Sequence, residues 1–254
     1  MEKKRQQIIK QTIRRTYGKI ALEDSSAGAC CAPGCCSGAS PAQAATDVGY
    51  DMNELGSVPQ ASVLGVGCGA PVKFADLQKG ETVVDLGSGA GIDVFLSANK
   101  VGRSGRVIGI DMTEEMVERA RRNAKKDDFV NVEFRKGDIE DRIPVDGNSA
   151  DVVISNCVIN LTTDKIKTFK EIHRILRGGG RMVISDLVAD RNADSIDPEM
   201  WSSCIDGALA KGDYLASIRK AGFKDASVLE ERQFMNGEPI NGRKITSIVV
   251  RAVK

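Results

Sequence analysis

The sequence predicts an α/β fold that is built on a doubly wound, mostly parallel sheet. In the string TVVDLGSGAGID at residues 82–93, apolar residues lead into Gly87, Gly89 and Gly91, and an apolar pattern then resumes. This pattern is typical of a strand, a tight glycine turn and the start of a helix. Strand and helix patterns alternate from there to residue 185, which favours parallel strands with helices on both faces of the sheet. Ligands bind such sheets at the carboxyl ends of the strands.

The expected elements follow in chain order. Strands are predicted from Thr82 onward and over Arg106–Ile110, Asn131–Arg135, Asp151–Ser155 and Arg181–Ser185. Helices are predicted over Glu114–Lys125 with Thr113 as N-cap, over Thr163–Leu176 before a run of three glycines, and near Gly212–Ala221. Two β-like runs, Ala226–Phe234 and Thr246–Val253, are joined by the turn-rich segment MNGEPINGRK and predict an antiparallel hairpin at the sheet edge. The sheet is therefore expected to have seven strands.

The composition argues against several classes of protein. The 36 basic and 35 acidic residues give a net charge of +1, which provides no overall field for nucleic acid or an anionic membrane, and aromatic residues are only 4%. No apolar run reaches the roughly 18 residues of a membrane helix, and the N-terminus lacks the apolar region of a signal peptide. We therefore expect a cytoplasmic protein without a nucleic-acid or membrane partner. Because no exposed apolar helix is evident, we expect a monomer.

The N-terminal part differs in character from the rest of the chain. Residues 1–22 carry apolar positions at helical spacing among seven Lys and Arg, which predicts an amphipathic helix packed on the main body. Residues 23–47 are mostly small and show no periodicity, which predicts a mobile, cysteine-rich segment. We therefore separate residues 1–47 from a main domain at 48–254. Within that domain, residues 187–222 begin without a clean strand signal and are interpreted as an insertion at the substrate site.

The cysteines are the second functional signal. Seven cysteines without an export signal argue against a disulfide framework and favour reduced thiols with chemical or metal-binding roles. Four of them lie in the small-residue segment: Cys30, Cys31, Cys35 and Cys36. Their spacing favours a thiophilic-ion site or a redox relay over a zinc site. Glycines bracket Cys68, so we expect its thiol at a surface or cleft. The single histidine, His173, excludes histidine-cluster metal sites and is expected to be a surface or packing residue.

Three acidic residues accompany the glycine turn. Asp85 precedes it, Asp111 ends the second strand and Asp138 follows the third. A carboxylate at the end of the second strand can accept hydrogen bonds from both hydroxyls of a ribose, and Asp138 can meet an adenine amino group. An acid just before the turn suits a positively charged ligand. The glycine turn alone does not fix the nucleotide, because dehydrogenases share it.

Together these features resemble the class I S-adenosylmethionine methyltransferases over about residues 80–254. The resemblance implies a Rossmann-like sheet of seven strands with an antiparallel C-terminal edge. It also implies that S-adenosylmethionine is the cosubstrate and that it binds at the ends of the predicted strands. The implied binding residues are Asp85, Gly87, Ser88, Gly89, Gly91, Asp111, Met112, Asp138, Ile139 and Asn156.

The strings LGVGCGAPV, SNCVINLTTDK and WSSCIDGAL, with the cysteine-rich segment upstream, resemble arsenite methyltransferases. This resemblance implies that Cys68, Cys157 and Cys204 bind As(III) and that the chain methylates arsenite and methylarsenite in arsenic detoxification. It also implies that a cysteine of the 30–36 cluster takes part in thiol exchange with a thioredoxin-like or glutathione-type reductant. The position of Cys157 indicates a substrate site independently of this resemblance, because Cys157 follows the fourth strand, where substrate-facing residues lie.

The implied chemistry is consistent. Three soft thiolates hold As(III) with its lone pair exposed, and that lone pair can attack a sulfonium methyl without a general base.

Three positions depart from the family pattern: Ala70, Asp206 and the pair Arg177-Gly178. Two alternatives remain open, a methyltransferase for a small organic, quinone-like acceptor and a non-catalytic protein that binds thiophilic ions. The glycine turn with its acids argues against the second, because sequestration needs no cosubstrate.

Overall fold

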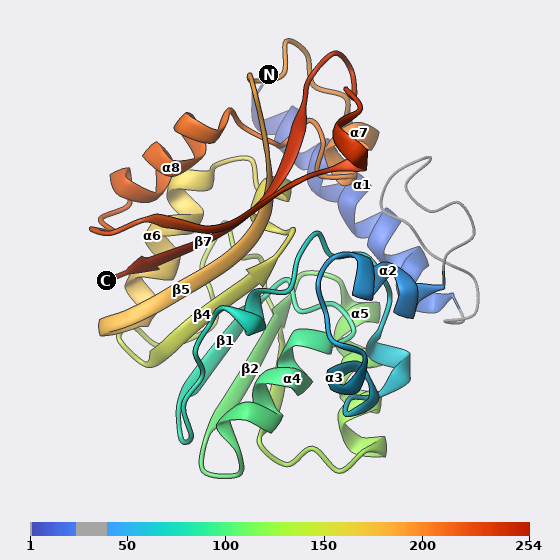
Figure 1. Ribbon diagram of the computed structural model, residues 1–254, viewed down its shortest axis with the longest axis vertical. Coiled ribbons are helices and arrows are strands. Elements are labelled where there is room, and N and C mark those ends of the chain that lie inside the picture. The colour runs from blue at the N-terminus through green and yellow to red at the C-terminus, as the bar shows by residue number, and fades with distance from the viewer. Residues whose placement is uncertain (1, 24–39) are drawn as a thin grey trace.

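A computed structural model describes residues 2–23 and 40–254 and contains a seven-stranded sheet in the order β3-β2-β1-β4-β5-β7-β6. The strands are β1 (Thr82–Leu86), β2 (Arg106–Asp111), β3 (Val132–Lys136), β4 (Ala150–Asn156), β5 (Leu176–Ala189), β6 (Ser227–Gln233) and β7 (Ile245–Val253). Strands β1 to β5 are parallel, and β7 pairs antiparallel with both β5 and β6 (Figure 1). The predicted fold class and its antiparallel C-terminal edge are confirmed.

Helices cover both faces of the sheet. They are α1 (Glu2–Leu22), α2 (Pro41–Asp47), α3 (Met52–Gly56), α4 (Ile92–Val101), α5 (Glu114–Lys126), α6 (Lys165–Ile175), α7 (Pro198–Ser202) and α8 (Lys211–Lys220). Four short 3₁₀ segments lie at Gln60–Ser62, Pro71–Lys73, Ile159–Leu161 and Met235–Gly237. Side chains of α6 and α8 pack in one core with the sheet, and those of α4 and α5 pack in another. Within residues 2–23 and 40–254, no helix is long and apolar enough to cross a membrane.

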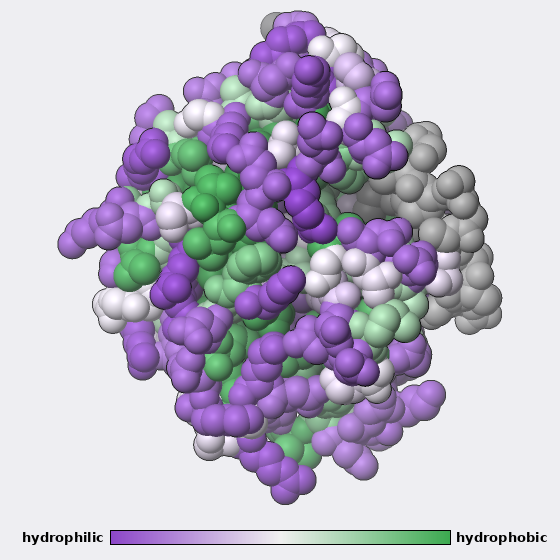
Figure 2. All heavy atoms as spheres, in the orientation of Figure 1, coloured by the Kyte–Doolittle hydropathy of each residue, from purple (hydrophilic) through white to green (hydrophobic). Residues whose placement is uncertain are grey.

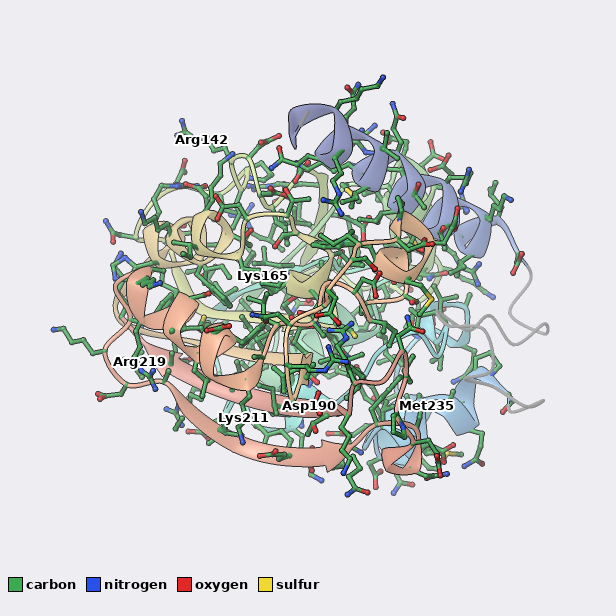
Figure 3. All side chains as sticks on the ribbon, turned by 90° about the horizontal axis from the view of Figure 1, so that it is seen from above. Arg142, Lys165, Asp190, Lys211, Arg219 and Met235 are labelled. Atoms are coloured by element: carbon green, nitrogen blue, oxygen red, sulfur yellow. The ribbon has the colours of Figure 1, made fainter. Side chains whose placement is uncertain are left out.

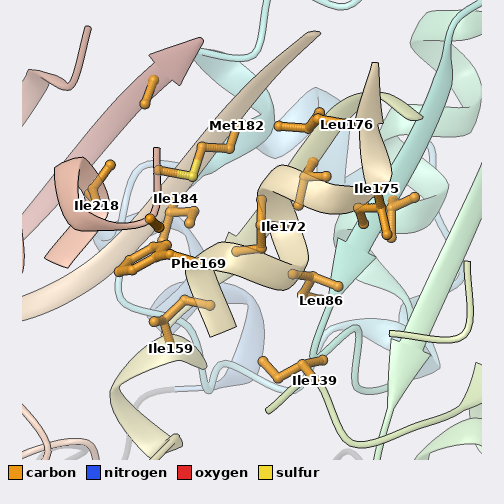
Figure 4. Close-up of a cluster of buried hydrophobic side chains, with 14 of the residues drawn as sticks. Leu86, Ile139, Ile159, Phe169, Ile172, Ile175, Leu176, Met182, Ile184 and Ile218 are labelled. Atoms are coloured by element: carbon orange, nitrogen blue, oxygen red, sulfur yellow. The ribbon is translucent and has the colours of Figure 1, made fainter. Parts of the chain in front are cut away.

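The alternation of side chains along the central strands explains the two cores. Val84 and Leu86 of β1 point into the core under α6 and α8, whereas Val83 points into the core under α4 and α5. Successive side chains of a strand face opposite sides of a sheet, so a strand that is apolar at every position fills both cores. Figure 4 shows the first of these cores, where Phe169 and Ile172 of α6 pack on the sheet.

Two element boundaries differ from the prediction. The helix expected at 163–176 begins at Lys165, because the Asp164 side chain accepts a hydrogen bond from Lys167 N and caps it. The strand expected at 181–185 extends from Leu176 to Ala189, so the three glycines lie inside β5 rather than before it. The register of β4 and β5 is irregular there, and glycine tolerates such a bulge.

The expectation of a mobile segment over residues 23–47 is wrong for its last part. Residues 41–47 form α2, because Ser40 Oγ accepts a hydrogen bond from Gln43 N at 3.2 Å and Pro41 starts the helix. Ala45 of this helix is buried against the main body. The predictions for Cys30, Cys31, Cys35 and Cys36 fall outside the described residues. The segment interpreted as an insertion, 187–222, begins within β5 and ends past α8, which is part of the core.

The amphipathic N-terminal helix is confirmed. Ile9, Ile13 and Ile20 of α1 are buried, and the helix packs on α5 and α7. Figure 2 shows hydrophilic residues over most of the face it depicts. The exposed large hydrophobic residues of the described part are Ile8 and Leu22, in different turns of α1, and Met52, Val130 and Leu229 on three other segments. Single residues of this kind are normal on a protein surface.

Candidate active site

The glycine turn after β1 is a position where side chains do not fit. Gly87, Gly89 and Gly91 have φ angles of 71°, 52° and 100°, in the left-handed region that favours glycine. A Cβ on Gly87 would lie 2.3 Å from the Val158 side chain, and one on Gly91 would lie 2.7 Å from Phe95. Backbone hydrogen bonds from Gly87 N and Ser88 N to Ile110 O, at 2.7 and 3.0 Å, fix the turn against β2.

Acidic residues hold and surround this turn. The Asp111 carboxylate accepts hydrogen bonds from Gly89 N at 2.9 Å and from Thr113 N at 2.8 Å. Asp85 is buried, and its pKa lies well above the usual value because of burial and the nearby charges of Asp93 and Asp111. A cationic ligand beside the turn would relieve this accumulation of buried acids.

A first hollow lies at the carboxyl ends of β1, β2, β3 and β4. Its walls include Asp111, Met112, Asp138, Ile139, Glu140, Gly87, Gly89, Asn156, Cys157 and Leu161. The structure thus brings together the residues expected to bind a nucleoside, although they come from four separate strand ends. Gly91 is not among the residues lining this hollow; it is the left-handed N-cap of α4.

Helix α1 forms part of the wall of the first hollow, through Lys10, Ile13 and Tyr17. Lys10 Nζ lies 2.8 Å from Asp138 Oδ2, so this carboxylate, expected to meet an adenine amino group, is paired with a lysine here. Lys10 was not among the predicted site residues, because only the apolar positions of this helix were expected to pack on the main body. The apolar residues Ile9 and Ile13 on either side of it were the signal that this face is buried.

A second hollow lies on the other side of the glycine turn. It is lined by Tyr50, Gly65, Val66, Gly67, Asp85, Gly87, Ser88, Gly89, Asp93 and Asn156, and it shares Val66, Gly87, Gly89 and Asn156 with the first. Ser88 Oγ is buried and has no hydrogen-bond partner among the described residues. Burial raises the pKa of Asp93 to about 6, although hydrogen bonds from Tyr50 and Asn156 oppose that shift. The connected hollows fit a nucleoside that carries a charged chain.

The three cysteines that the sequence analysis grouped lie together in one apolar cluster, although 89 and 47 residues separate them along the chain. We call Cys68, Cys157 and Cys204 the thiol cluster. The Sγ atoms of Cys68 and Cys157 and a carboxylate oxygen of Asp186 all lie within 4.8 Å of one another. Cys204 Sγ donates a hydrogen bond to Cys157 O at 3.0 Å. All three residues are free cysteines.

Two features of the thiol cluster differ from expectation or were not foreseen. Cys68 is only 3% exposed and packs in an apolar layer, so the expectation of a surface position is wrong. Hydrogen bonding to Cys204 and Cys68, together with burial, raises the pKa of the Cys157 thiol well above its usual value. Cys157 also lines the first hollow, so the thiol cluster borders the space where the nucleoside-like ligand fits.

Buried polar residues adjoin the thiol cluster. The Asp186 carboxylate accepts hydrogen bonds from Tyr214 Oη at 3.0 Å and from Leu187 N at 3.1 Å. Lys165, labelled in the interior of Figure 3, donates from Nζ to the carbonyl oxygens of Asn160 and Thr162 at 3.3 and 3.2 Å. Burial raises the pKa of Asp186 and lowers that of Lys165. The sequence analysis missed both; for Asp186 the signal was an acid directly after an apolar strand core.

Other predicted residues have structural roles. His173 stacks edge-to-face with Phe223, with 5.2 Å between the ring centroids, as expected for a packing residue. Asp206, one of the departures from the family pattern, is buried and lies 3.5 Å from Arg243 Nη2. Its carboxylate therefore links the loop that carries Cys204 to Arg243.

Comparisons with known proteins agree with this geometry. A family model described as a methyltransferase domain matches residues 77–222. An arsenite methyltransferase of Halobacterium salinarum is 44% identical over 83% of this chain and 53% of its own length, and one of Aquipseudomonas alcaligenes is 36% identical over 87% and 64%. The chain thus spans less than two thirds of these curated relatives.

Among solved structures, the chain is similar to an arsenic(III) S-adenosylmethionine methyltransferase from Chlamydomonas reinhardtii. The two are 32% identical, the match covers 84% of this chain and 73% of that one, and the TM-score is 0.67. The chain therefore belongs to the methyltransferase family that includes these arsenite methyltransferases.

Proposed function

We propose that this protein transfers the methyl group of S-adenosylmethionine to trivalent arsenic held by Cys68, Cys157 and Cys204. The observation that carries the proposal is the position of the thiol cluster, which borders the first hollow through Cys157. Three thiols that converge beside a nucleoside-sized site are unnecessary for an organic acceptor. The names of the relatives support the same substrate class.

The residues of the two hollows fit the cosubstrate, which supplies an electrophilic methyl group on a sulfonium when bound. Asp111 and Met112 would hold the ribose and adenine, with Ile139 beside the ring. Ser88, whose buried hydroxyl has no partner in the described part of the chain, and the backbone of the glycine turn would hold the charged chain. The buried acids Asp85 and Asp93 would favour its positive charge.

Arsenite is the substrate in this proposal, and its loading balances without an added base. Each cysteine thiol replaces one hydroxide of arsenous acid, and the thiol proton leaves with that hydroxide as water. The raised pKa of Cys157 means that the thiol is protonated before arsenic arrives, so the proton is available for the leaving group. Three sulfur ligands leave one lone pair on arsenic, which is the nucleophile.

The apolar surroundings of the thiol cluster serve two purposes. Leu161, Leu187 and Trp201 exclude water from the arsenic site, which protects arsenic–sulfur bonds from hydrolysis. Trp201 Nε1 donates to Leu161 O at 2.9 Å, which fixes the indole in that wall. Because the chemical step needs no proton transfer, alignment of the lone pair with the methyl group does most of the catalytic work.

Further parts of the proposal concern electrons and location. Methylation oxidises As(III) to As(V), and return to As(III) needs two electrons, which two thiols supply by forming a disulfide. We propose that a cysteine of the 30–36 cluster enters this exchange and that a thioredoxin-like or glutathione-type reductant restores the thiols. The free thiols at Cys68, Cys157 and Cys204 suit the reducing cytoplasm, where we place the protein. The monomeric state stays a prediction.

A turnover assay tests the proposal. The full chain is incubated with S-adenosylmethionine, arsenite and a thiol reductant, and arsenic species are separated by chromatography with element-specific mass detection. We expect methylated arsenic from the parent and at least a 100-fold lower rate from Cys157→Ser, with S-adenosylmethionine affinity unchanged within about twofold. Methylation of a quinone-like acceptor that survives in Cys157→Ser would instead favour the organic-acceptor function. Arsenite binding without any methyl transfer would favour a non-catalytic binding protein.

A further inference from the structure

Asn156 joins the two halves of the site. Its Oδ1 accepts a hydrogen bond from Cys68 N at 3.1 Å, and its Nδ2 donates to Gly69 O at 2.7 Å. A Cβ on Gly67 would lie 2.6 Å from Asn156 Nδ2, so the loop that carries Cys68 sits directly on this amide. The end of β4 thus fixes the backbone of one thiol residue and continues directly into Cys157, another.

Tyr50 extends this contact into the second hollow. Asn156 Nδ2 donates to Tyr50 Oη at 2.8 Å, and Tyr50 Oη donates to Asp93 Oδ2 at 2.8 Å. A longer bond of 3.3 Å joins Asn156 Nδ2 to Asp93 Oδ2 directly. Since a hydroxyl carries one proton and the carboxylate accepts it, the direction of the chain is fixed: Asn156 to Tyr50 to Asp93. Tyr50 and Asp93 are 6% and 3% exposed, so bulk water does not compete for these bonds.

Cys68 is also held from the opposite side, by β7. Ser247 Oγ donates to Cys68 O at 2.7 Å. Ser247 is not among the residues that line either hollow. The backbone of Cys68 therefore has one side-chain anchor that leads to the proposed cosubstrate site, at its N–H, and one that does not, at its carbonyl, and the two can be removed separately.

We propose that Asn156 and Tyr50 are positioning residues that couple occupancy of the second hollow to the placement of Cys68. This inference rests on the proposed function. Asp93, Tyr50 and Asn156 all line the second hollow, so a ligand that fills it restrains these three side chains and the hydrogen bonds that join them. The free-energy cost of ordering the Cys68 loop when arsenite binds is then smaller. Each ligand therefore tightens the binding of the other by the same factor.

The experiment measures that factor directly. Trp201 is the only tryptophan and packs in the apolar cluster that contains all three thiols, so its fluorescence reports arsenite binding. The Kd of arsenite for the full chain is measured with and without saturating S-adenosylhomocysteine. The Kd of S-adenosylhomocysteine is measured by calorimetry with and without arsenite. For the parent we expect each Kd to fall by the same factor, about 5 to 150.

Tyr50→Phe keeps the ring and removes only the hydroxyl. We expect its factor to fall below about 2, while its arsenite Kd without S-adenosylhomocysteine stays within about threefold of the parent. Ser247→Ala is the matched control. We expect it to weaken arsenite binding about fivefold both with and without S-adenosylhomocysteine, so the ratio of the two arsenite Kd values stays that of the parent. Asn156→Asp keeps the acceptor for Cys68 N but loses the donors, and it should lose the factor as Tyr50→Phe does.

The outcomes separate this inference from the proposed function. A parent that binds and methylates arsenite but shows a factor near one overturns the coupling alone, and so does a Tyr50→Phe variant with the parent's factor. A Ser247→Ala variant that loses the factor also overturns it, because general loosening of Cys68 would then explain the effect. A parent that does not bind arsenite overturns the proposed function and the inference with it.

Discussion

The two sides of the candidate site are built in different ways. On the proposed cosubstrate side, one continuous stretch, residues 82–113, supplies β1, the glycine turn and the end of β2, and other segments complete the two hollows. The thiol side is assembled from loops near residues 68, 157 and 204 and from Asp186 of β5, and it works through side chains. Ligand binding on the first side should therefore be most sensitive to side-chain atoms added to the glycine turn. Ligand binding on the second side should be most sensitive to replacement of a sulfur atom.

The backbone conformations show the same difference. On the cosubstrate side the left-handed positions are glycines, which adopt them at little cost. On the thiol side Cys157 and Cys204 adopt positive φ angles of 60° and 66° without being glycine. Backbone hydrogen bonds hold them there, from Cys157 N to Ser185 O of β5 at 2.8 Å and from Cys204 N to Trp201 O at 2.9 Å. Strain of this kind is found where the position of a side chain matters more than local stability.

The largest effect should come from one added methyl group in the glycine turn. In Gly87→Ala the new Cβ would lie 2.3 Å from Val158, and the φ of 71° is unfavourable for alanine. We expect the free energy of unfolding to fall by about 3 kcal/mol or more and S-adenosylmethionine affinity to fall at least 100-fold. Denaturant unfolding and calorimetry measure these quantities. Gly178→Ala is the control, since its Cβ meets nothing within 4 Å; equal effects of the two variants would refute the steric argument.

This division also explains what could be predicted from the sequence. The fold followed from strand and helix periodicity and from one turn, because these signals lie within short windows. The glycines, Asp85 and Asp111 followed from the same stretch. The thiol cluster was found only through resemblance, because no spacing rule brings together residues 89 and 47 positions apart.

The residues that were missed are those whose partners lie far away in sequence. Lys10 pairs with Asp138 across 128 positions, and Tyr50 pairs with Asp93 across 43. A lysine on an amphipathic helix and a tyrosine in a loop carry no local sign of such a partner. Cys68 was expected at a surface or cleft rather than in a packed layer, because its flanking glycines predicted a tight turn. They instead allow close packing, since a Cβ on Gly69 would lie 2.0 Å from Ser185 Oγ.

On the thiol side, exchanging one atom should have the next largest effect. In Cys204→Ser the hydroxyl can still donate to Cys157 O, as the thiol does at 3.0 Å, so the loop is expected to keep its conformation. Oxygen is a harder ligand than sulfur, so arsenite affinity should fall about 100-fold, whereas S-adenosylhomocysteine affinity should stay within about twofold. Trp201 fluorescence and calorimetry measure the two affinities. Ser203→Ala, next in the chain, should keep arsenite affinity within threefold; arsenite binding by Cys204→Ser at the parent's affinity would remove Cys204 from the ligand set.

The smallest effect is expected from the charge state of Asp93, on the cosubstrate side. Burial raises the pKa of this carboxyl to about 6, above its usual 3.8, so the folded state binds the proton more tightly than the unfolded state. The resulting stabilisation is fully present below about pH 4 and is lost as the pH rises through 6. A change of roughly 2 pH units in pKa corresponds to about 2 to 3 kcal/mol, and the buried neighbour Asp85 contributes in the same direction.

Denaturant unfolding between pH 4 and 7 tests this expectation. Relative to Asp93→Asn, which stays neutral and still accepts the hydrogen bond from Tyr50, the parent should lose stability as the pH rises from 4 to 6. Asp194→Asn, whose side chain is 86% exposed, should follow the parent. A parent and an Asp93→Asn variant with parallel pH profiles would mean that the carboxylate is already stabilised in its charged form. A positively charged ligand would then gain little from it, and the cosubstrate side would depend on its backbone alone.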